Sequence, residues 1–75
     1  MNILFFAAVA EVAGTERLEI TGPGRISELK TNLEEMFPEL VNMKYTIAVN
    51  QEICHDDKEI FEQDEVALLP PFSGG

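Results

Sequence analysis

Apolar and polar positions along the chain predict short strands at both ends and one long helix between them. Residues 3–9 form an unbroken apolar run that is too short for a typical helix, so we expect a buried strand. Residues 10–14 have room for one helical turn, which Gly14 would close in a left-handed conformation. Residues 16–21 alternate between polar and apolar side chains, as a half-buried strand does.

The helix follows a Gly-Pro-Gly break at residues 22–24. Its apolar side chains recur at spacings of three and four residues, opposite a charged side. Pro38 should end the helix or bend its last turn, which leaves about 12 residues of regular helix. We interpret the apolar stripe as core packing rather than as a ligand surface, and it consists of Ile26, Leu29, Leu33, Met36, Phe37 and Leu40.

A hairpin is predicted in the second half of the chain. Residues 45–49 alternate in the manner of a strand, and residues 50–51 favour a tight turn whose type stays open, because Asn suits such a turn better than Gln. Ile53 begins the return strand. Residues 55–65 then form a polar, irregular connection that contains a second turn.

Residues 66–69 form the last apolar strand, which Pro70 and Pro71 terminate because proline lacks a backbone donor. Two strands, a helix and further strands are typical of an α+β fold, a β-grasp (ubiquitin-like) mixed sheet with one main helix on one face. The first and last strands would lie parallel at its centre. We therefore expect a β-grasp domain over residues 1–69 and an extended, flexible Gly-Gly tail over residues 70–75.

The first and last strands are apolar on both of their faces, although one helix covers only one face of a sheet. An uncovered apolar cluster usually marks a protein interface. We predict such a surface near the base of the tail, formed by Phe6, Ile53, Leu69 and Phe72. The alternative is that residues 55–63 fold over this face and cover it.

The charge narrows the choice of partners. Fourteen acidic and five basic residues give a net charge of −9, which repels phosphate backbones and anionic lipid. Nucleic acid and membrane surfaces are therefore poor candidates, whereas a basic protein partner or simple solubility explains the excess. The apolar start of the chain lacks a preceding basic region and is too short to span a bilayer, so we expect a cytoplasmic protein.

Few side chains in the sequence could catalyse a reaction. The chain has one cysteine, which excludes an internal disulfide. Cys54 and His55 are adjacent, so in a strand their side chains would point to opposite faces, a poor geometry for a thiolate–histidine pair. Cys54 fits a small core residue better than a persulfide carrier, and His55 beside two aspartates fits an acidic loop better than a zinc site. No metal-ligand cluster and no phosphate-binding glycine loop is evident. We expect no bound cofactor and no enzymatic activity of the chain on its own.

The remaining chemical group is the α-carboxylate of Gly75. ATP could activate it as an acyl-adenylate, and sulfur could then displace AMP to leave a thiocarboxylate. Gly74 and Gly75 have no Cβ, so they would pass through a narrow channel in a partner enzyme, while Pro70 and Pro71 hold the base of the tail extended. Six residues reach at most about 20 Å. The alternative is a frayed end without a role.

Four segments support a family resemblance: "LFFA", "AVNQ", "DEVA" and the final "PPFSGG". Their order and spacing over essentially the whole chain resemble the small subunits of molybdopterin synthase, the MoaD-type sulfur carriers of the ubiquitin-like MoaD/ThiS group. The resemblance implies a β-grasp fold and an E1-like adenylating enzyme that uses ATP to activate Gly75. A sulfur-donating enzyme then installs the thiocarboxylate.

The resemblance also implies a place in molybdenum cofactor biosynthesis. The tail, Pro70 to Gly75 with Phe72 and Ser73 between, would enter the large synthase subunit and donate sulfur to cyclic pyranopterin monophosphate. The complex would be a heterotetramer whose catalytic lysines belong to the large subunit. Family interface positions correspond to Phe6, Ile53 and Leu69. Leu69 departs from the family, which often has an aromatic residue there, but it keeps an apolar anchor at this position.

Three other functions stay open at this stage. The chain could carry sulfur for thiazole (thiamine) synthesis, whose carrier also ends in Gly-Gly but usually lacks the proline pair. It could be a ubiquitin-like modifier that joins lysines through Gly75. It could also be an interaction domain with an irrelevant tail.

Overall fold

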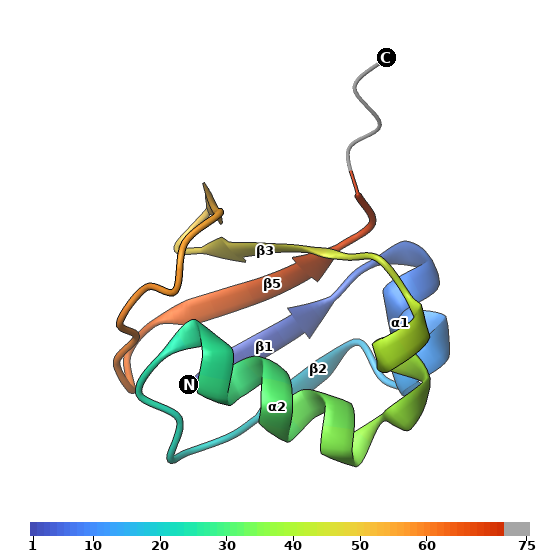
Figure 1. Ribbon diagram of the computed structural model, residues 1–75, viewed down its shortest axis with the longest axis horizontal. Helices are drawn as coiled ribbons and strands as arrows, with labels where there is room; N and C mark the ends of the chain where they lie inside the picture. The colour runs from blue at the N-terminus through green and yellow to red at the C-terminus, as the bar shows by residue number, and fades with distance from the viewer. Residues whose placement is uncertain (72–75) are drawn as a thin grey trace.

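Five strands form one mixed sheet in the computed structural model, which describes residues 1–71 (Figure 1). They are β1 (Asn2–Phe5), β2 (Arg17–Glu19), β3 (Thr46–Val49), β4 (Glu52–Cys54) and β5 (Glu65–Leu69). The strand order is β2-β1-β5-β3-β4, in which β1 and β5 are parallel and all other neighbours are antiparallel. The predicted β-grasp fold, with the first and last strands adjacent, is confirmed.

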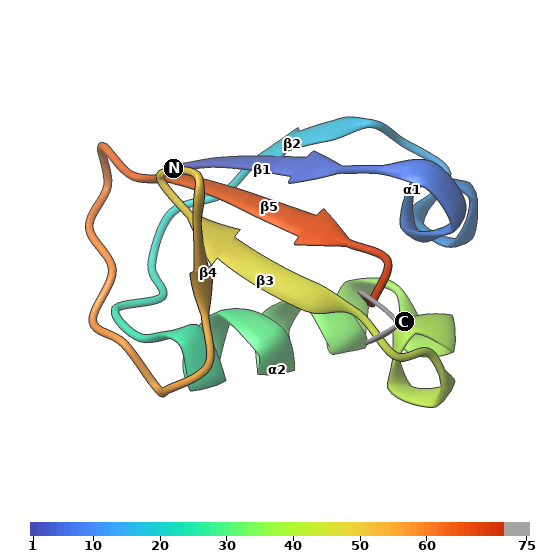
Figure 2. The same ribbon diagram turned by 90° about the horizontal axis from the view of Figure 1, so that it is seen from above.

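The helices are α1 (Ala7–Ala13), α2 (Ile26–Met36) and a short 3₁₀ helix, η1 (Pro38–Asn42). Helix α2 runs along one side of the sheet, and α1 lies at the end where β1 finishes (Figures 1 and 2). Among residues 1–71, no helix has both the length and the apolar composition that a bilayer crossing requires. The largest fully buried side chains come from helices and strands alike: Ile3, Val9, Leu29, Leu33, Leu40, Val49, Val66 and Leu68.

The strand predicted over residues 3–9 is wrong in its second half. β1 ends at Phe5, and residues 7–13 form α1 instead. Four of the seven residues of α1 are alanine, the strongest helix former, and a short apolar run does not by itself distinguish a strand from a buried helix. Gly14 closes α1 with a φ of 74°, and its N–H donates to the Ala10 carbonyl, which confirms its predicted capping role.

The long helix agrees with its predicted limits but not with its whole apolar stripe. It ends at Met36, directly before the residue that precedes Pro38. The sequence predicted Met36 as a core residue, and this is wrong because its side chain is 45% exposed. Leu40 is fully buried, but from η1 rather than from the helix. Phe37 packs edge-on against Phe5, with 5.8 Å between the ring centroids.

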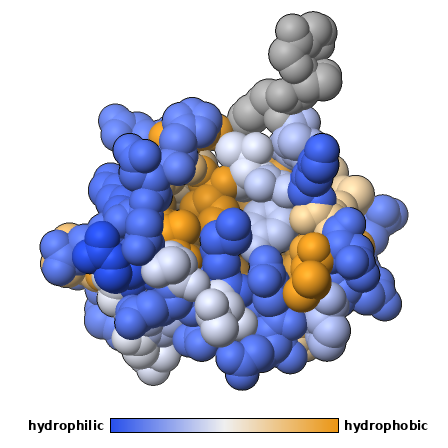
Figure 3. Space-filling view, in the orientation of Figure 1, coloured by the Kyte–Doolittle hydropathy of each residue, from blue (hydrophilic) through white to orange (hydrophobic). Residues whose placement is uncertain are grey.

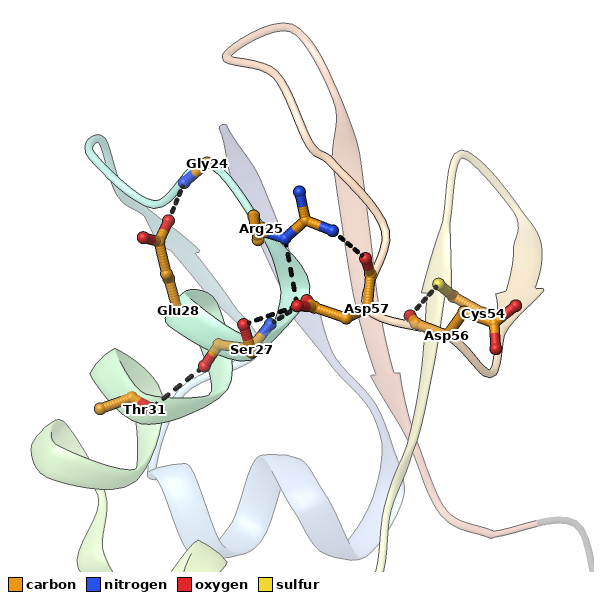
Figure 4. Close-up of polar contacts among 8 residues, drawn as sticks. All are labelled: Gly24, Arg25, Ser27, Glu28, Thr31, Cys54, Asp56 and Asp57. Atoms are coloured by element: carbon orange, nitrogen blue, oxygen red, sulfur yellow. Dashed lines mark hydrogen bonds and ion pairs between the residues drawn. The ribbon is translucent and has the colours of Figure 1, made fainter.

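The start of α2 is capped by a residue from a distant loop (Figure 4). The carboxylate of Asp57 accepts the Ser27 backbone N–H at 2.8 Å, the Ser27 hydroxyl at 3.0 Å and the Arg25 Nε–H at 3.1 Å. Glu28 accepts the Gly24 N–H at 2.7 Å. The bond to the Ser27 N–H satisfies one of the donors that the first turn of a helix leaves without an intrahelical partner. The other bonds tie Gly24 and the side chains of Arg25 and Ser27 to the same region.

The β3–β4 hairpin has the predicted turn at residues 50–51. Asn50 and Gln51 have φ values of 50° and 70°, as a type I′ turn requires. The Asn50 side chain also holds the start of β5, because it accepts the Glu65 N–H at 3.1 Å and donates to Asp64 at 3.0 Å. The turn residue thereby links the hairpin to the central strand.

Candidate partner surface and carrier tail

The base of the predicted tail leaves the sheet from its central strand. Leu69, the last residue of β5, pairs with Thr46 of β3, and Pro70 and Pro71 follow directly. Proline has no backbone donor, so the ladder stops there. Pro70 is half-buried and Pro71 is exposed. The other predicted tail residues, Phe72, Ser73, Gly74 and Gly75, lie outside the described residues.

The face of the sheet opposite α2 carries a row of apolar side chains across four strands. Leu4 on β1 pairs with Ala67 on β5, Ala67 with Ala48 on β3, and Ala48 with Ile53 on β4. Because side chains alternate along a strand, this row points away from the buried set that faces α2.

Two larger side chains extend this row toward the end of β5. Leu69 lies two residues beyond Ala67 on β5, and Phe6 lies two residues beyond Leu4, directly after the end of β1. The backbone of Phe6 is still extended, so both side chains point to the same face as this row. Phe6 is 44% exposed, and Leu69 is half-buried. At the far end of the row, Ile53 is 40% exposed. We name these six residues the partner surface, a role that stays a prediction: Leu4, Phe6, Ala48, Ile53, Ala67 and Leu69, of which Ala48 is only 4% exposed.

The structure therefore brings together three of the four predicted interface residues, Phe6, Ile53 and Leu69, on one face. Phe72 lies outside the described residues. Leu4, Ala48 and Ala67 were missing from the predicted surface. The alternation of the strands contained the signal for Leu4 and Ala67, because each falls on the same side of its strand as a predicted interface residue.

The connection after β4 does not cover this surface. The Ile26 N–H donates to the Lys58 carbonyl at 3.0 Å, and the Ile60 N–H donates to the Gly24 carbonyl at the same distance. Ile60 is 3% exposed and belongs to the core on the α2 side. The connection thus packs against the start of α2, and the alternative in which it folds over the apolar face is wrong.

A sharp change in backbone direction fixes Phe6 at the end of β1. Its N–H donates to the Leu68 carbonyl at 3.1 Å, which continues the pairing with β5. The next residue, Ala7, has a φ of 54°, a left-handed conformation that costs a non-glycine residue free energy. Strained residues of this kind are concentrated at functional sites. No sequence pattern marks Ala7, because alanine normally avoids this conformation.

Cys54 is a packing residue in this structure. It is half-buried against the core, and its thiol donates to the Asp56 carbonyl at 3.2 Å (Figure 4). His55 is exposed. Within residues 1–71, no three His, Cys, Asp or Glu side chains lie together as ligands of a metal ion would.

An apolar hollow beside α2 is visible on the otherwise largely hydrophilic face in Figure 3. A cavity of about 240 Å³ there lies between α2 and the β3–β4 hairpin and includes Ile26, Ile47 and Cys54 in its lining. Tyr45 closes one side of it and donates a 2.7 Å hydrogen bond to Glu34. Burial, together with this bond to a carboxylate, raises the pKa of Tyr45 well above its usual range. The hydroxyl is therefore a structural donor that joins β3 to α2.

Sequence comparison gives relatives over the full chain. The model of the ThiS family matches residues 3–75. A molybdopterin synthase sulfur carrier subunit of Aedes aegypti is 34% identical over all of this chain and 88% of its own length. The subunit of the same description from Escherichia coli is 31% identical over all of this chain and 99% of its own length.

Structural comparison gives neighbours with the same fold. A chain from Pyrococcus furiosus assigned as molybdopterin converting factor subunit 1 has a TM-score of 0.87 at 23% identity, with 95% of each chain covered. The small archaeal modifier protein 1 of Haloferax volcanii has a TM-score of 0.77 at 25% identity, covering 96% of this chain and 97% of its own.

A third neighbour comes from a complex. It is a complex of subunits 1 and 2 of the molybdopterin-converting factor from Helicobacter pylori. The matching chain has a TM-score of 0.72 at 25% identity, and the match covers 99% of this chain and 96% of that one. The family match over residues 3–75 covers the whole five-stranded sheet, including the central strand β5 from which the tail continues. This chain belongs to the ThiS family.

Proposed function

We propose that this protein is the sulfur carrier subunit of a molybdopterin synthase. One observation carries the proposal: the central strand β5 ends in Pro70 and Pro71 beside the exposed apolar partner surface, and the sequence continues from there to Gly-Gly. The full-length likeness to relatives described as molybdopterin synthase sulfur carrier subunits supports the same function.

The proposed chemistry takes place at Gly75. Its carboxylate attacks the α-phosphate of ATP on an E1-like adenylating enzyme, which releases pyrophosphate and leaves an acyl-adenylate. A sulfur nucleophile from a sulfur-donating enzyme then attacks the acyl carbon, and AMP leaves. If the nucleophile is a cysteine persulfide of the donor, this attack leaves an acyl disulfide. A second thiol then attacks the donor cysteine sulfur, forms a disulfide with it and releases the C-terminal thiocarboxylate, so the net change on this chain replaces one oxygen by sulfur. ATP is a substrate of the partner enzyme and not a cofactor of this chain.

The partner surface supplies the affinity in this proposal, and the tail supplies the reactive group. A large synthase subunit would cover Phe6, Ile53 and Leu69, the most prominent apolar side chains on that face, while the tail enters its active site. The acid-base residues for sulfur transfer to cyclic pyranopterin monophosphate would come from that subunit. The expected complex is a heterotetramer with one small subunit at each end.

Intact-mass measurement tests the sulfur-carrier function. Incubation with ATP, the adenylating enzyme and a sulfur source should add about 16 Da, the difference between sulfur and oxygen. The Cys54→Ser variant should gain the same mass, because the half-buried Cys54 is not the carrier in this proposal. A mass gain that Cys54→Ser abolishes, or no gain with enzymes that modify a known carrier, would contradict the proposal.

A second candidate function is protein modification. The likeness to the small archaeal modifier protein 1 of Haloferax volcanii favours it, because that relative has the same fold over nearly the whole chain. A modifier would form an amide bond between the Gly75 carbonyl and a lysine side chain of a target. Conjugates that resist thiols and contain Gly75 linked to lysine would identify this function. Copurification with a thiazole-forming enzyme would instead identify the third possibility, a carrier for thiazole synthesis.

A further inference from the structure

Among residues 1–71, a short window of the sheet edge at β2 has backbone groups without partners. β2 is an outermost strand of the sheet. Met1 and Ile20 exchange both of their backbone hydrogen bonds at 3.0 Å, so Ile20 faces β1. Pairing in an antiparallel ladder alternates, and the N–H and C=O of the preceding residue, Glu19, therefore point away from β1 toward the open edge.

The other outward-facing position of β2 is already occupied. The Thr15 hydroxyl donates to the Arg17 carbonyl at 2.9 Å and accepts the Arg17 N–H at 3.3 Å. This local pair blocks the start of the edge, as natural proteins commonly do with exposed strands. The window for an added strand consequently begins at Glu19 and is only a few residues long.

An apolar groove lies directly beneath this open window. Its volume is about 350 Å³, and it runs between β2 and the second half of α2. The apolar part of its lining is Leu18, Ile20 and Met36, of which Met36 is 45% exposed. Glu35 stands on its rim, and Glu19 also lines the groove, although alternation along β2 points the Glu19 side chain to the opposite face of the sheet. A strand added to β2 would place every second side chain on the α2 side of the sheet, against this groove.

We propose that this edge and groove bind an extended segment of a partner protein, with two apolar side chains two residues apart and flanking lysine or arginine residues. The backbone of the segment would pair with Glu19, and its apolar side chains would contact Leu18, Ile20 and Met36. Its basic residues would face Glu35 on the groove side and Glu19 on the opposite face of the sheet. Main-chain pairing gives such complexes affinity, and the alternating side chains give them specificity.

Charge argues for a basic partner rather than a second copy of this chain. The net charge of −9 makes two copies repel each other, and antiparallel pairing of two β2 edges would bring the acidic rims together. The groove also lies on the α2 side of the sheet, whereas Phe6, Ile53 and Leu69 point to the opposite side. Both surfaces could be occupied at once. The inference does not depend on the proposed sulfur-carrier function.

Titration with a defined peptide tests this inference. The probe is a fluorescein-labelled peptide, Lys-Lys-Val-Ile-Val-Leu-Lys-Lys, followed by fluorescence anisotropy and by two-dimensional amide NMR spectra of the full chain. We expect saturable binding, amide shifts concentrated at residues 18–21 and 32–36, and weaker binding as salt rises from about 50 to about 300 mM. Replacing the central Ile of the peptide by Pro should weaken binding because one backbone donor is lost.

Matched variants distinguish binding in the groove from non-specific binding of the basic peptide to the acidic protein. Met36→Glu places a charge in the groove and should weaken binding about tenfold. Val41→Glu is the control, because Val41 is 63% exposed in η1 and does not line the groove. Its affinity should equal that of the wild type, and both variants should keep the wild-type melting temperature within a few degrees.

Three outcomes would overturn the inference. One is the absence of amide shifts at residues 18–21 when the peptide concentration is raised to about 1 mM, which would mean a Kd weaker than about 1 mM. Another is shifts confined to the Phe6 and Ile53 face. The third is a concentration-dependent dimer in sedimentation velocity that Met36→Glu dissociates, since a second copy would then be the occupant of the groove.

Discussion

Phe6 has an exposed aromatic ring and lies directly before a residue with a left-handed backbone conformation. The residue that follows it, Ala7, has a φ of 54°, which turns the chain abruptly from β1 into α1. Phe6 itself stays paired with β5 through its bond to the Leu68 carbonyl. The ring is therefore held on the partner surface by the sheet and not by a mobile loop.

Replacement of Phe6 by Asp should weaken binding to a molybdopterin synthase large subunit by about tenfold or more, because the loss of an aromatic anchor and the burial of a charge act in the same direction. Calorimetric titration would measure the change. Val41→Asp provides the control, since it introduces the same charge at a 63% exposed residue outside the partner surface. Equal affinities of wild type and Phe6→Asp would refute the assignment of this surface.

Two residues with positive φ should respond in opposite ways to exchange of alanine and glycine. Gly14→Ala should lower the free energy of unfolding by about 1 kcal/mol through backbone strain alone. Its φ is 74°, and no atom lies within 4 Å of an added Cβ. Ala7→Gly should not lower the free energy, because glycine removes the strain of the left-handed conformation. Urea unfolding would measure both, and a Gly14→Ala variant as stable as the wild type would contradict the strain argument.

At the scale of elements, the most informative contact joins α2 to the connection after β4. Asp57 belongs to that connection and holds three donors from residues 25 and 27. The Ser27 backbone N–H, and then the Arg25 side chain, hold the pKa of Asp57 below its usual range. The contact orients α2 and keeps the connection on the α2 side, so the opposite face stays open.

The lowered pKa of Asp57 predicts a pH dependence of stability. A carboxyl group whose folded pKa lies below its unfolded pKa stabilises the protein above the unfolded value, and this contribution is lost as the pH falls through the folded value. Asp57→Asn should therefore be less stable than the wild type at pH 7, and the difference should shrink below about pH 4.

Urea unfolding between pH 7 and pH 3 would measure this difference. Asp56→Asn is the matched control, because only the backbone carbonyl of Asp56 is in a hydrogen bond among residues 1–71. A constant difference between wild type and Asp57→Asn over the whole pH range would show that ionisation of Asp57 does not contribute. Asp64, whose pKa is lowered by Asn50 and the Phe61 N–H, adds a second acid-sensitive contact that both proteins share.

The elements differ in how far the sequence alone predicts them. Strand β5 and helix α2 each bury one clear set of side chains, so alternation or helical spacing predicts them. Strand β3 follows from its alternating sequence, although Ile47, Ala48 and Val49 are all buried in the structure. Residues 7–9 were mispredicted because Ala and Val fit a buried strand and a short helix equally well.

The path of the connection after β4 could not be predicted from local pattern. It depends on Asp57 reaching the start of α2 about thirty positions earlier, a contact that forms only in the folded chain. For the same reason the sequence left open whether this connection covers the apolar face. That Phe6 and Leu69 lie on one face could be predicted, because alternation in two apolar strands separates their two sets of side chains. Their role in binding a partner stays a prediction.

At the scale of the whole molecule, the fold separates three regions. The partner surface occupies one face of the sheet, and the groove beside β2 lies on the α2 side. Strand β5 delivers the base of the tail from the centre of the sheet (Figure 2). Among residues 1–71, the largest fully buried side chains all belong to helices and strands, and none to the prolines that follow Leu69. Chemistry at Gly75 should therefore be independent of fold stability.

The central claim is that the reactive carbon is the carbonyl carbon of Gly75, and a chain extended by one alanine after Gly75 tests it most directly. Wild type and extended chain would be incubated with ATP, the adenylating enzyme and the sulfur source, and their intact masses and melting temperatures compared. The account predicts a gain of about 16 Da for the wild type only, with equal melting temperatures. An equal mass gain in both chains would contradict it, because the sulfur would then reside elsewhere.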